Sequence, residues 1–132
     1  MIWWTGFPGQ KVDDIWTQAL PLLRRGFESP EIADRYYDKC KDGKAQLWGV
    51  FEDQHILAAM LTEIVTIGGR KVCNVISIGG TRMKEWFHFM PLLEQWAREN
   101  GCAAMRHANC RLGWAKALKD YETTRITLEK AL

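Results

Sequence analysis

Residues 71–100 read KVCNVISIGGTRMKEWFHFMPLLEQWAREN and join a strand pattern to a helix pattern through a double glycine. β-Branched residues dominate 72–78, which predicts a pleated strand. Gly79-Gly80 removes side chains where the chain must turn sharply. An apolar stripe at helical spacing then predicts an amphipathic helix over 82–99: Met83, Trp86, Phe87, Met90, Leu93 and Ala97. Free N–H groups at the start of such a helix suit an anion, although most strand-to-helix turns bind nothing.

The segment before this stretch begins with a short strand pattern and two helix patterns. Met1–Trp4 is apolar and suits an edge strand. Apolar spacing from Lys11 predicts a helix that kinks or restarts at Pro21, because proline lacks an N–H and clashes with the preceding turn. Ser29-Pro30-Glu31 has the N-cap, first-position proline and early acidic residue of a second helix, which ends at Asp42-Gly43.

Strand patterns dominate the middle of the chain. Three of them follow one another and predict an antiparallel meander: 45–51, 55–67 and 71–79. Gly68-Gly69 predicts the second hairpin turn, and Pro91 predicts a kink or restart in the long helix. The run 102–108 predicts a buried strand parallel to 71–79 through the helical crossover. A short helix over 113–119 and a final strand over 125–132 complete the prediction.

Length and composition indicate one soluble globular domain. The chain has 132 residues, of which 47% are hydrophobic and 26% are charged, and this length suffices for a real core. Its formal charge of +2 comes without a long basic run, which argues against a nucleic-acid-binding protein. The N-terminus lacks the basic and apolar regions of a signal peptide, and no apolar run is long enough to span a bilayer. We therefore expect a cytoplasmic protein that does not bind membranes.

The four cysteines have irregular spacing and form no CxxC pair. Cys73 and Cys102 lie in apolar strand patterns, which predicts buried thiols in a reducing compartment. Cys102, His107 and Cys110 are the nearest approach to a metal-ligand set. They lack the close pairing and the fourth ligand of a zinc site, so no metal is predicted.

The order of these patterns and several local sequences resemble the GNAT acyltransferase superfamily. The sequences that carry the resemblance are spread over residues 11–132: QLWGVFED (46–53), MLTEIV (60–65), VISIGG (75–80) followed by EW (85–86), LEQWARENGC (93–102) and CRLGWAKALKDY (110–121). In detail the chain is similar to the short GNAT-like proteins often encoded in tailed-phage genomes. The resemblance implies a single α+β domain over 1–132, with a mixed, mostly antiparallel sheet flanked by helices.

The resemblance also implies an acetyl-CoA site. GNAT enzymes bind acetyl-CoA where two central strands splay apart, and the pyrophosphate lies on the turn that opens the long helix. The residues implied for this site are Ser77, Ile78, Gly79, Gly80, Thr81, Arg82, Lys84 and, just past the following strand, Asn109. The turn GGTRMK does not contain the superfamily signature Gln/Arg-x-x-Gly-x-Gly/Ala, since it has bulky residues where the signature has small ones.

Two residues are candidates for acid–base chemistry. Strand periodicity places Glu63 on one face with apolar neighbours, so a partly buried carboxylate could take a proton from an attacking ammonium: Leu57, Ala59, Leu61 and Val65. Alternatively Glu63 is exposed, or pairs with Arg70 or Lys71. Tyr121 is the candidate general acid for the leaving thiolate, or it packs beside Trp114.

The sequence is compatible with two functions. The first is an acetyl-CoA-dependent N-acetyltransferase with an unspecified amine acceptor. The alternative is a catalytically inactive GNAT-like protein that acts as a phage structural or host-interaction protein, in the host cytoplasm or the virion. The expected partners are an acyl donor and an amine acceptor in the first case, and a phage or host protein in the second. A homo-oligomer is compatible with both.

Overall fold

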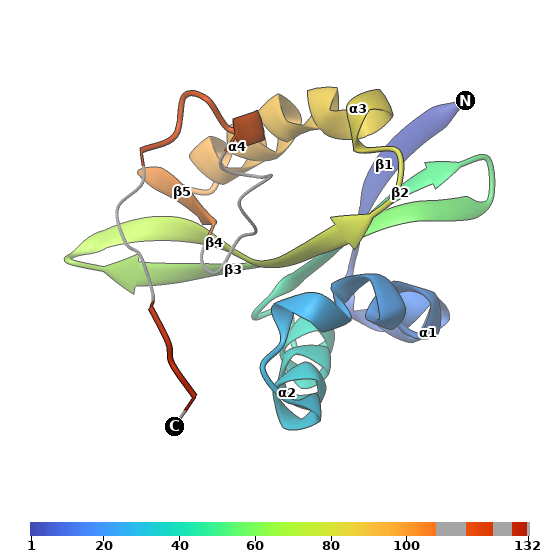
Figure 1. Cartoon of the computed structure of the whole chain (residues 1–132), viewed down its shortest axis with the longest axis horizontal. Helices are drawn as coiled ribbons and strands as arrows, with labels where there is room; N and C mark the ends of the chain where they lie inside the picture. Colours follow the sequence, from blue (N-terminus) through green and yellow to red (C-terminus); the bar gives the residue numbers. More distant parts are fainter. Residues whose placement is uncertain (108–115, 123–127, 132) are drawn as a thin grey trace.

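The computed structural model describes residues 1–107, 116–122 and 128–131 and contains one five-stranded sheet with helices on both faces (Figure 1). The strands lie in chain order: β1 (Ile2–Phe7), β2 (Gln46–Glu52), β3 (His55–Ile67), β4 (Arg70–Gly80) and β5 (Ala104–His107). The helices are α1 (Val12–Leu23), α2 (Pro30–Lys41), α3 (Met83–Trp86) and α4 (Met90–Glu99). The expected mixed, mostly antiparallel sheet flanked by helices is confirmed.

The sheet follows the predicted order of pairing. Strands β1 to β4 pair antiparallel with their neighbours, and β5 pairs parallel with β4. Gly68 and Gly69 both have positive φ, as the tight hairpin between β3 and β4 requires. Strand β1 is the edge strand of one side and carries no charged side chain. The antiparallel meander and the parallel fifth strand are therefore confirmed.

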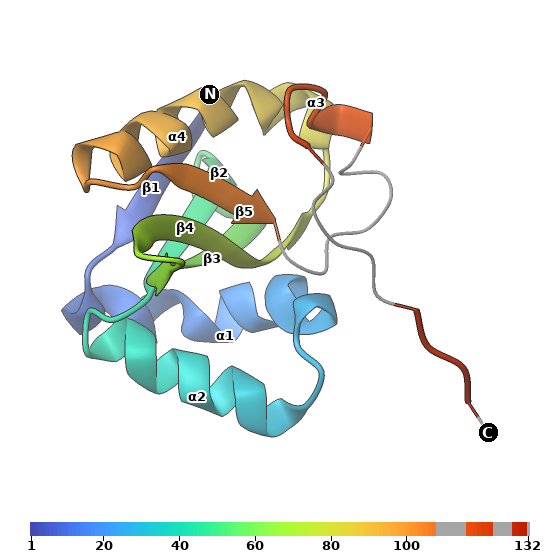
Figure 2. The same ribbon diagram turned by 90° about the vertical axis from the view of Figure 1, so that its left-hand side faces the viewer.

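Helices α1 and α2 cover one face of the sheet, as the end-on view shows (Figure 2). A hydrophobic core lies beneath them, built from α1, α2, β2 and β3: Val12, Ile15, Ala19, Leu23, Cys40, Leu47, Phe51, Ala59 and Leu61. The expected restart at Pro21 is wrong, because α1 runs through Pro21 to Leu23. Pro21 is exposed, so water can satisfy the carbonyl that the missing N–H leaves unpaired.

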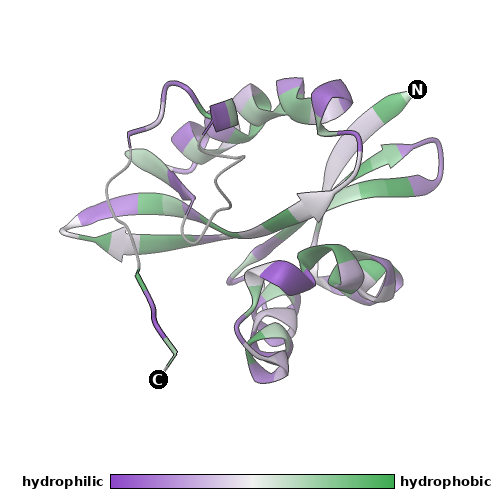
Figure 3. Ribbon diagram, in the orientation of Figure 1, coloured by the Kyte–Doolittle hydropathy of each residue, from purple (hydrophilic) through white to green (hydrophobic). Residues whose placement is uncertain are grey.

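Helices α3 and α4 cover the opposite face. A second core lies between them and the sheet: Trp48, Val50, Leu57, Ala58, Trp86, Met90 and Leu93. The last three belong to the predicted apolar stripe, and Met83 and Phe87 of that stripe pack against this core. The predicted long helix is interrupted by a 3-10 turn at Phe87–Phe89 and restarts at Met90, with Pro91 in the first turn of α4. The restart is thus confirmed. Figure 3 shows β2 and β3 as largely hydrophobic and the start of β4 as hydrophilic.

The C-terminal predictions are only partly covered by the described residues. Of the helix predicted over 113–119, residues 116–117 are helical, residues 118–119 are not, and residues 113–115 lie outside the described part. Residues 128–131 do not form a strand, so that part of the predicted final strand is wrong. Among the described helices, none is both long and apolar enough to cross a membrane.

Candidate functional site

Strands β4 and β5 pair over a short distance and then separate. Their parallel ladder runs from Val72–Ala104 to Val75–His107, and in the described residues β4 continues to Gly80 without β5 beside it. Figure 1 shows the same arrangement, with β5 along only the first part of β4. We call the point just after Val75 and His107 the fork. Among the described residues, its open side leaves backbone N–H and C=O groups of β4 without a strand partner.

A β-bulge lies at the fork. Leu61 of β3 pairs with Ser77 and Thr62 pairs with Val75, so Ile76 is an extra residue on β4. As a result, both Ile76 and Ser77 face α1: Ile76 packs on the core beneath that helix, and the Ser77 hydroxyl donates to the Leu23 carbonyl oxygen at 2.6 Å. The bulge therefore turns β4 just where it leaves β5.

Ile78 faces the other way, toward α3 and α4. It lines a cavity of about 30 Å³ together with aromatic side chains from β1, β2, α3 and the 3-10 turn before α4: Trp4, Trp48, Trp86 and Phe89. The walls are apolar, so the cavity offers no acid or base. It can accept only a small apolar group.

The double glycine is not the turn that the sequence predicts. Gly79 and Gly80 belong to β4, and the turn is made by Thr81 and by Arg82, whose φ is 59°. A Cβ at Gly79 would lie 2.0 Å from the Leu22 carbonyl oxygen, so this glycine allows α1 to approach β4. Gly80 has a φ of 153°, which side chains disfavour. Gly79 thus serves the packing of α1 on β4, and Gly80 serves the close approach of β4 to β3.

The junction between β4 and α3 is already well bonded. The Arg82 guanidinium pairs with Glu52 at 2.8 Å and also with Glu85, and it lowers the pKa of both carboxyls. The Thr81 N–H donates to the Leu57 carbonyl oxygen. Of the cations implied for a pyrophosphate, Lys84 is exposed and has no acidic partner among the described residues. An anion at this junction would therefore meet two carboxylates as well as Arg82 and Lys84.

Glu63 points toward α2, with 14% of its side chain exposed. Its carboxylate pairs with the Lys39 ammonium at 2.6 Å and accepts a hydrogen bond from the Tyr36 hydroxyl at 3.2 Å. Burial, and after it Glu63, raises the pKa of Tyr36 to about 12. The expected partial burial is confirmed, whereas pairing with Arg70 or Lys71 is wrong because α2 supplies the partner.

The predicted set of neighbours on the Glu63 face needs one correction. Leu57 packs in the core beneath α3 and α4, on the opposite face. A second bulge explains this: Val50 pairs with Ala58 and Phe51 pairs with Ile56, which leaves Leu57 as the extra residue. Strict alternation over the whole strand therefore fails at its first residues.

Two polar residues stand beside Glu63 and were not predicted from the sequence. Asn74 of β4 is the register partner of Glu63, and Arg106 of β5 is the register partner of Asn74. The three side chains form a row across the face of the sheet that α2 partly covers, and we call it the polar row. Asn74 is a polar residue within the apolar run VCNVIS, and this contrast is the feature of the sequence that could have identified it as a site residue.

Tyr121 lies at the fork on the opposite face. Its hydroxyl donates to the Glu94 carboxylate of α4, and its ring contacts His107 edge-on at 5.2 Å. Burial, followed by Glu94, raises the pKa of Tyr121, and burial lowers the pKa of His107 to about 4. At neutral pH the phenol is protonated and His107 is uncharged. The candidate acid Tyr121 therefore lies beside His107, the last paired residue of β5.

Several predicted candidates cannot be placed. Asn109, Cys110 and Trp114 lie outside the described residues. Within the described residues, Cys40 and Cys73 are buried free thiols and Cys102 is partly buried. No group of three potential metal ligands occurs among the residues that the structure describes.

No protein-family model matches the sequence, and neither does any curated protein. Solved structures match almost the whole chain. A GCN5-related N-acetyltransferase from Ralstonia eutropha JMP134 has a TM-score of 0.71 at 11% identity, covering 100% of this chain and 99% of its own.

Two further structures have a similar extent of agreement. An aminoglycoside acetyltransferase from an uncultured soil metagenomic sample, solved with sisomicin, has a TM-score of 0.71 at 9% identity and covers 99% of this chain and 96% of its own. A predicted acetyltransferase from Clostridium acetobutylicum, solved with acetyl-CoA, has a TM-score of 0.68 at 14% identity with the same two coverages. This chain therefore has the fold of the GCN5-related (GNAT) N-acetyltransferases.

Proposed function

We propose that this protein is an N-acetyltransferase that takes an acetyl group from acetyl-CoA and passes it to an amine. The observation that carries the proposal is the fork between β4 and β5, which has a candidate base on one face and a candidate acid on the other. Glu63 lies opposite Asn74, one residue before the fork, and Tyr121 contacts His107 at the fork itself. A base that takes the amine proton and an acid that protonates the leaving thiolate both accelerate acyl transfer to an amine.

The free edge of β4 fits the amide-containing arm of CoA. Ser77 and Ile78 pair with β3 but have no strand partner on their other side among the described residues, so their backbone groups there can bond to amides as in an added strand. The junction at Thr81 and Arg82 fits the pyrophosphate less well, because the two carboxylates paired to Arg82 compete with an anion. Lys84 is the cation left to favour phosphate there. Gly79 and Gly80 contribute by packing, and the role of Asn109 stays a prediction.

The residues at the fork can account for both protons of the reaction. Acetyl-CoA, when bound, supplies the acetyl group as a thioester. In this proposal Glu63, which Lys39 and Tyr36 hold by an ion pair and a hydrogen bond, takes the proton of the amine as the nitrogen bonds to the carbonyl carbon and the carbon–sulfur bond breaks. Tyr121, oriented by Glu94, can return a proton to the sulfur that leaves.

The test is calorimetric titration with acetyl-CoA, followed by an acetyl-transfer assay over a panel of amines. Lys84→Glu should weaken binding at least about tenfold, and Lys11→Glu, an equal change at another exposed lysine, should not. Glu85→Gln should strengthen binding, because it removes one of the carboxylates that compete at Arg82. The absence of binding at millimolar acetyl-CoA would reject the proposal.

A second candidate function is a GNAT-fold protein without catalysis that binds another protein. The bonded junction at Arg82 favours it, because that arginine is committed to Glu52 and Glu85 within the fold. A structural or host-interaction role in a phage would belong to this candidate, and the similarity to phage proteins stays a prediction. Binding of acetyl-CoA without transfer to any amine in the panel would favour this second function.

A further inference from the structure

The polar row interrupts an apolar surface. The next row along the same face consists of Val65, Val72 and Ala104, and Val72 is 1% exposed. Register partners on neighbouring strands lie about 5 Å apart, so the row spans about 10 Å from Glu63 to Arg106. Three polar side chains side by side on such a surface need partners, and among the described residues α2 supplies them for Glu63 alone.

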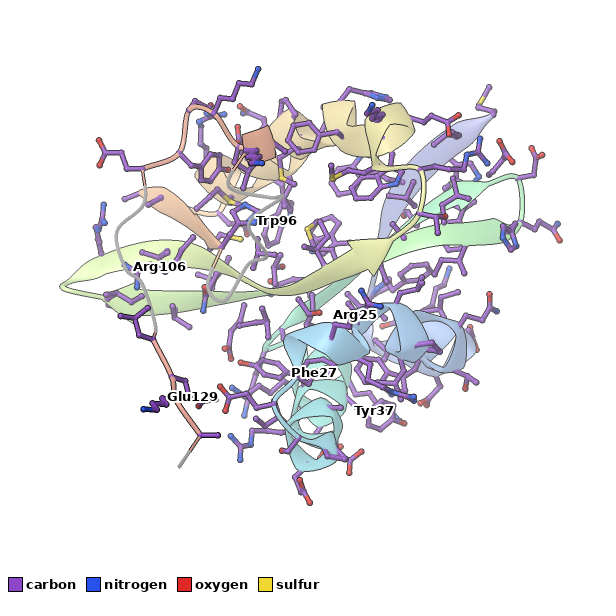
Figure 4. The ribbon with its side chains drawn as sticks, viewed as in Figure 1. Arg25, Phe27, Tyr37, Trp96, Arg106 and Glu129 are labelled. Atoms are coloured by element: carbon purple, nitrogen blue, oxygen red, sulfur yellow. The ribbon has the colours of Figure 1, made fainter. Side chains whose placement is uncertain are left out.

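Glu63 has its partners on α2, whereas within the described residues the Asn74 oxygen has no donor and Arg106 has no acidic partner. The Asn74 Oδ1 atom is buried and has no hydrogen-bond partner among the described residues. Arg106 is partly buried, and no carboxylate in the described part of the chain pairs with it. Figure 4 shows Arg106 displaced from β5 toward the side of the sheet on which Phe27 and Tyr37 lie. A buried acceptor and an unpaired guanidinium therefore stand next to each other.

We propose that the polar row binds the acceptor substrate, and that this substrate is an amine carrying an anionic group, a carboxylate or a phosphate, about 5 Å away. The amine would donate to the Asn74 Oδ1 atom beside Glu63, and the anionic group would pair with Arg106. Lys39 already neutralises Glu63, so Arg106 leaves one positive charge uncompensated. The inference rests on the proposed function, since only the fork makes this amine an acetyl acceptor.

An amine without an acidic group fits this site poorly. It would satisfy Asn74 but leave the guanidinium of Arg106 unpaired, and it would add a second cation beside it. A simple anion would satisfy Arg106 and leave the Asn74 oxygen without a donor. Only a molecule with both groups completes the row.

The probe for this inference is 4-aminobutyrate, with butylamine and methyl 4-aminobutyrate as matched compounds that lack the free acid, and O-phosphoethanolamine as the phosphate counterpart. Binding is measured by calorimetry on the full chain without CoA. The expected result is saturable binding of 4-aminobutyrate or O-phosphoethanolamine, at least about tenfold tighter than butylamine or the ester. Arg106→Gln should remove that preference, whereas Arg70→Gln, the same change at an exposed arginine of β4, should keep it.

Equal binding of butylamine and the two acidic probes would overturn the inference, as would no binding of either acidic probe at 10 mM. Titration with acetyl-CoA in parallel separates this inference from the proposed function. If acetyl-CoA binds and transfers to neutral amines alone, the function stands and the acidic acceptor is wrong. If the acidic probes bind while acetyl-CoA does not, the site exists and the transferase is wrong.

Asn74→Val supplies a second, independent measurement. Valine suits a strand and removes the buried oxygen that lacks a partner, so the variant should unfold at a higher temperature than the wild type. It should also lose affinity for 4-aminobutyrate by at least about tenfold. A variant that unfolds earlier than the wild type, or binds the probe equally well, would show that Asn74 is part of the packing and does not bind an acceptor.

Discussion

Replacing Gly79 with alanine should destabilise the protein through one contact. The added Cβ would lie 2.0 Å from the Leu22 carbonyl oxygen, at least 1 Å closer than real Cβ contacts allow. Because the opposing atom belongs to the backbone, the end of α1 must move away from β4. Overpacking of this kind costs about 1–3 kcal/mol. The shift also stretches the hydrogen bond from Ser77 to the Leu23 carbonyl oxygen, which adds about 1 kcal/mol.

The assay is urea unfolding, with the free energy of unfolding taken from the midpoint and slope. We expect Gly79→Ala to lose about 2–4 kcal/mol. Ser77→Ala isolates the hydrogen bond and should lose about 1 kcal/mol. Gly43→Ala is the backbone control, because its Cβ would meet nothing within 4 Å and only its φ of 75° opposes the change. If Gly79→Ala matches the wild type within about 0.5 kcal/mol, the close approach of α1 to β4 is refuted.

Three further predictions concern side chains near the fork. The pKa of His107 is about 4 in the folded protein and about 6.5 in the unfolded chain, so the free energy of unfolding keeps its full value above pH 7 and falls by up to about 3 kcal/mol as the pH drops to 4. His107→Gln should reduce this pH dependence when urea unfolding is measured at several pH values. An unchanged pH dependence in the variant would contradict the prediction. Lys39→Met leaves the Glu63 carboxylate without its cation and should lower the free energy of unfolding by about 1–2 kcal/mol. A stabilised variant would show that desolvating the ion pair costs more than the pairing contributes. Tyr121→Phe removes the hydrogen bond to Glu94 and should lower the free energy of unfolding by about 1 kcal/mol. In an active enzyme the same change should lower kcat about 100-fold with KM unchanged. An unchanged kcat would mean that the phenol only packs.

Patterns within single segments predicted most of the fold. Alternation over 55–67 and the double glycine at residues 68–69 specify the β3–β4 hairpin, because both signals are local. The apolar spacing over 83–97 predicted the buried side of α3 and α4. Ser29-Pro30 likewise marked the start of α2. In each case neighbours in sequence determine the backbone, so no knowledge of distant contacts is needed.

The candidate site was less predictable because its contacts join distant segments. Glu63 meets Lys39 only because α2 lies against β3, and charge alone favoured the nearer basic residues at the start of β4. In the sequence Gly79 resembles a turn glycine, and only the structure shows that it lies against α1. The bulge at Ile76 shifts the side-chain faces by one residue, and Asn74 and Arg106 become neighbours only through the β4–β5 register. None of these relations has a signature within one segment.

The uncharged edge strand β1 has a consequence for how this protein behaves in concentrated solution. The Asp53 N–H donates to the Met1 carbonyl oxygen, so alternation of the ladder turns the N–H and C=O groups of Ile2, Trp4 and Gly6 outward. Trp3 beside them is 39% exposed. Strand β1 contains no lysine or proline, the residues that commonly prevent an edge strand from pairing with a strand of another molecule. Colloidal stability therefore depends on the charged helices, and since the net charge is only +2, added salt should promote association by screening them.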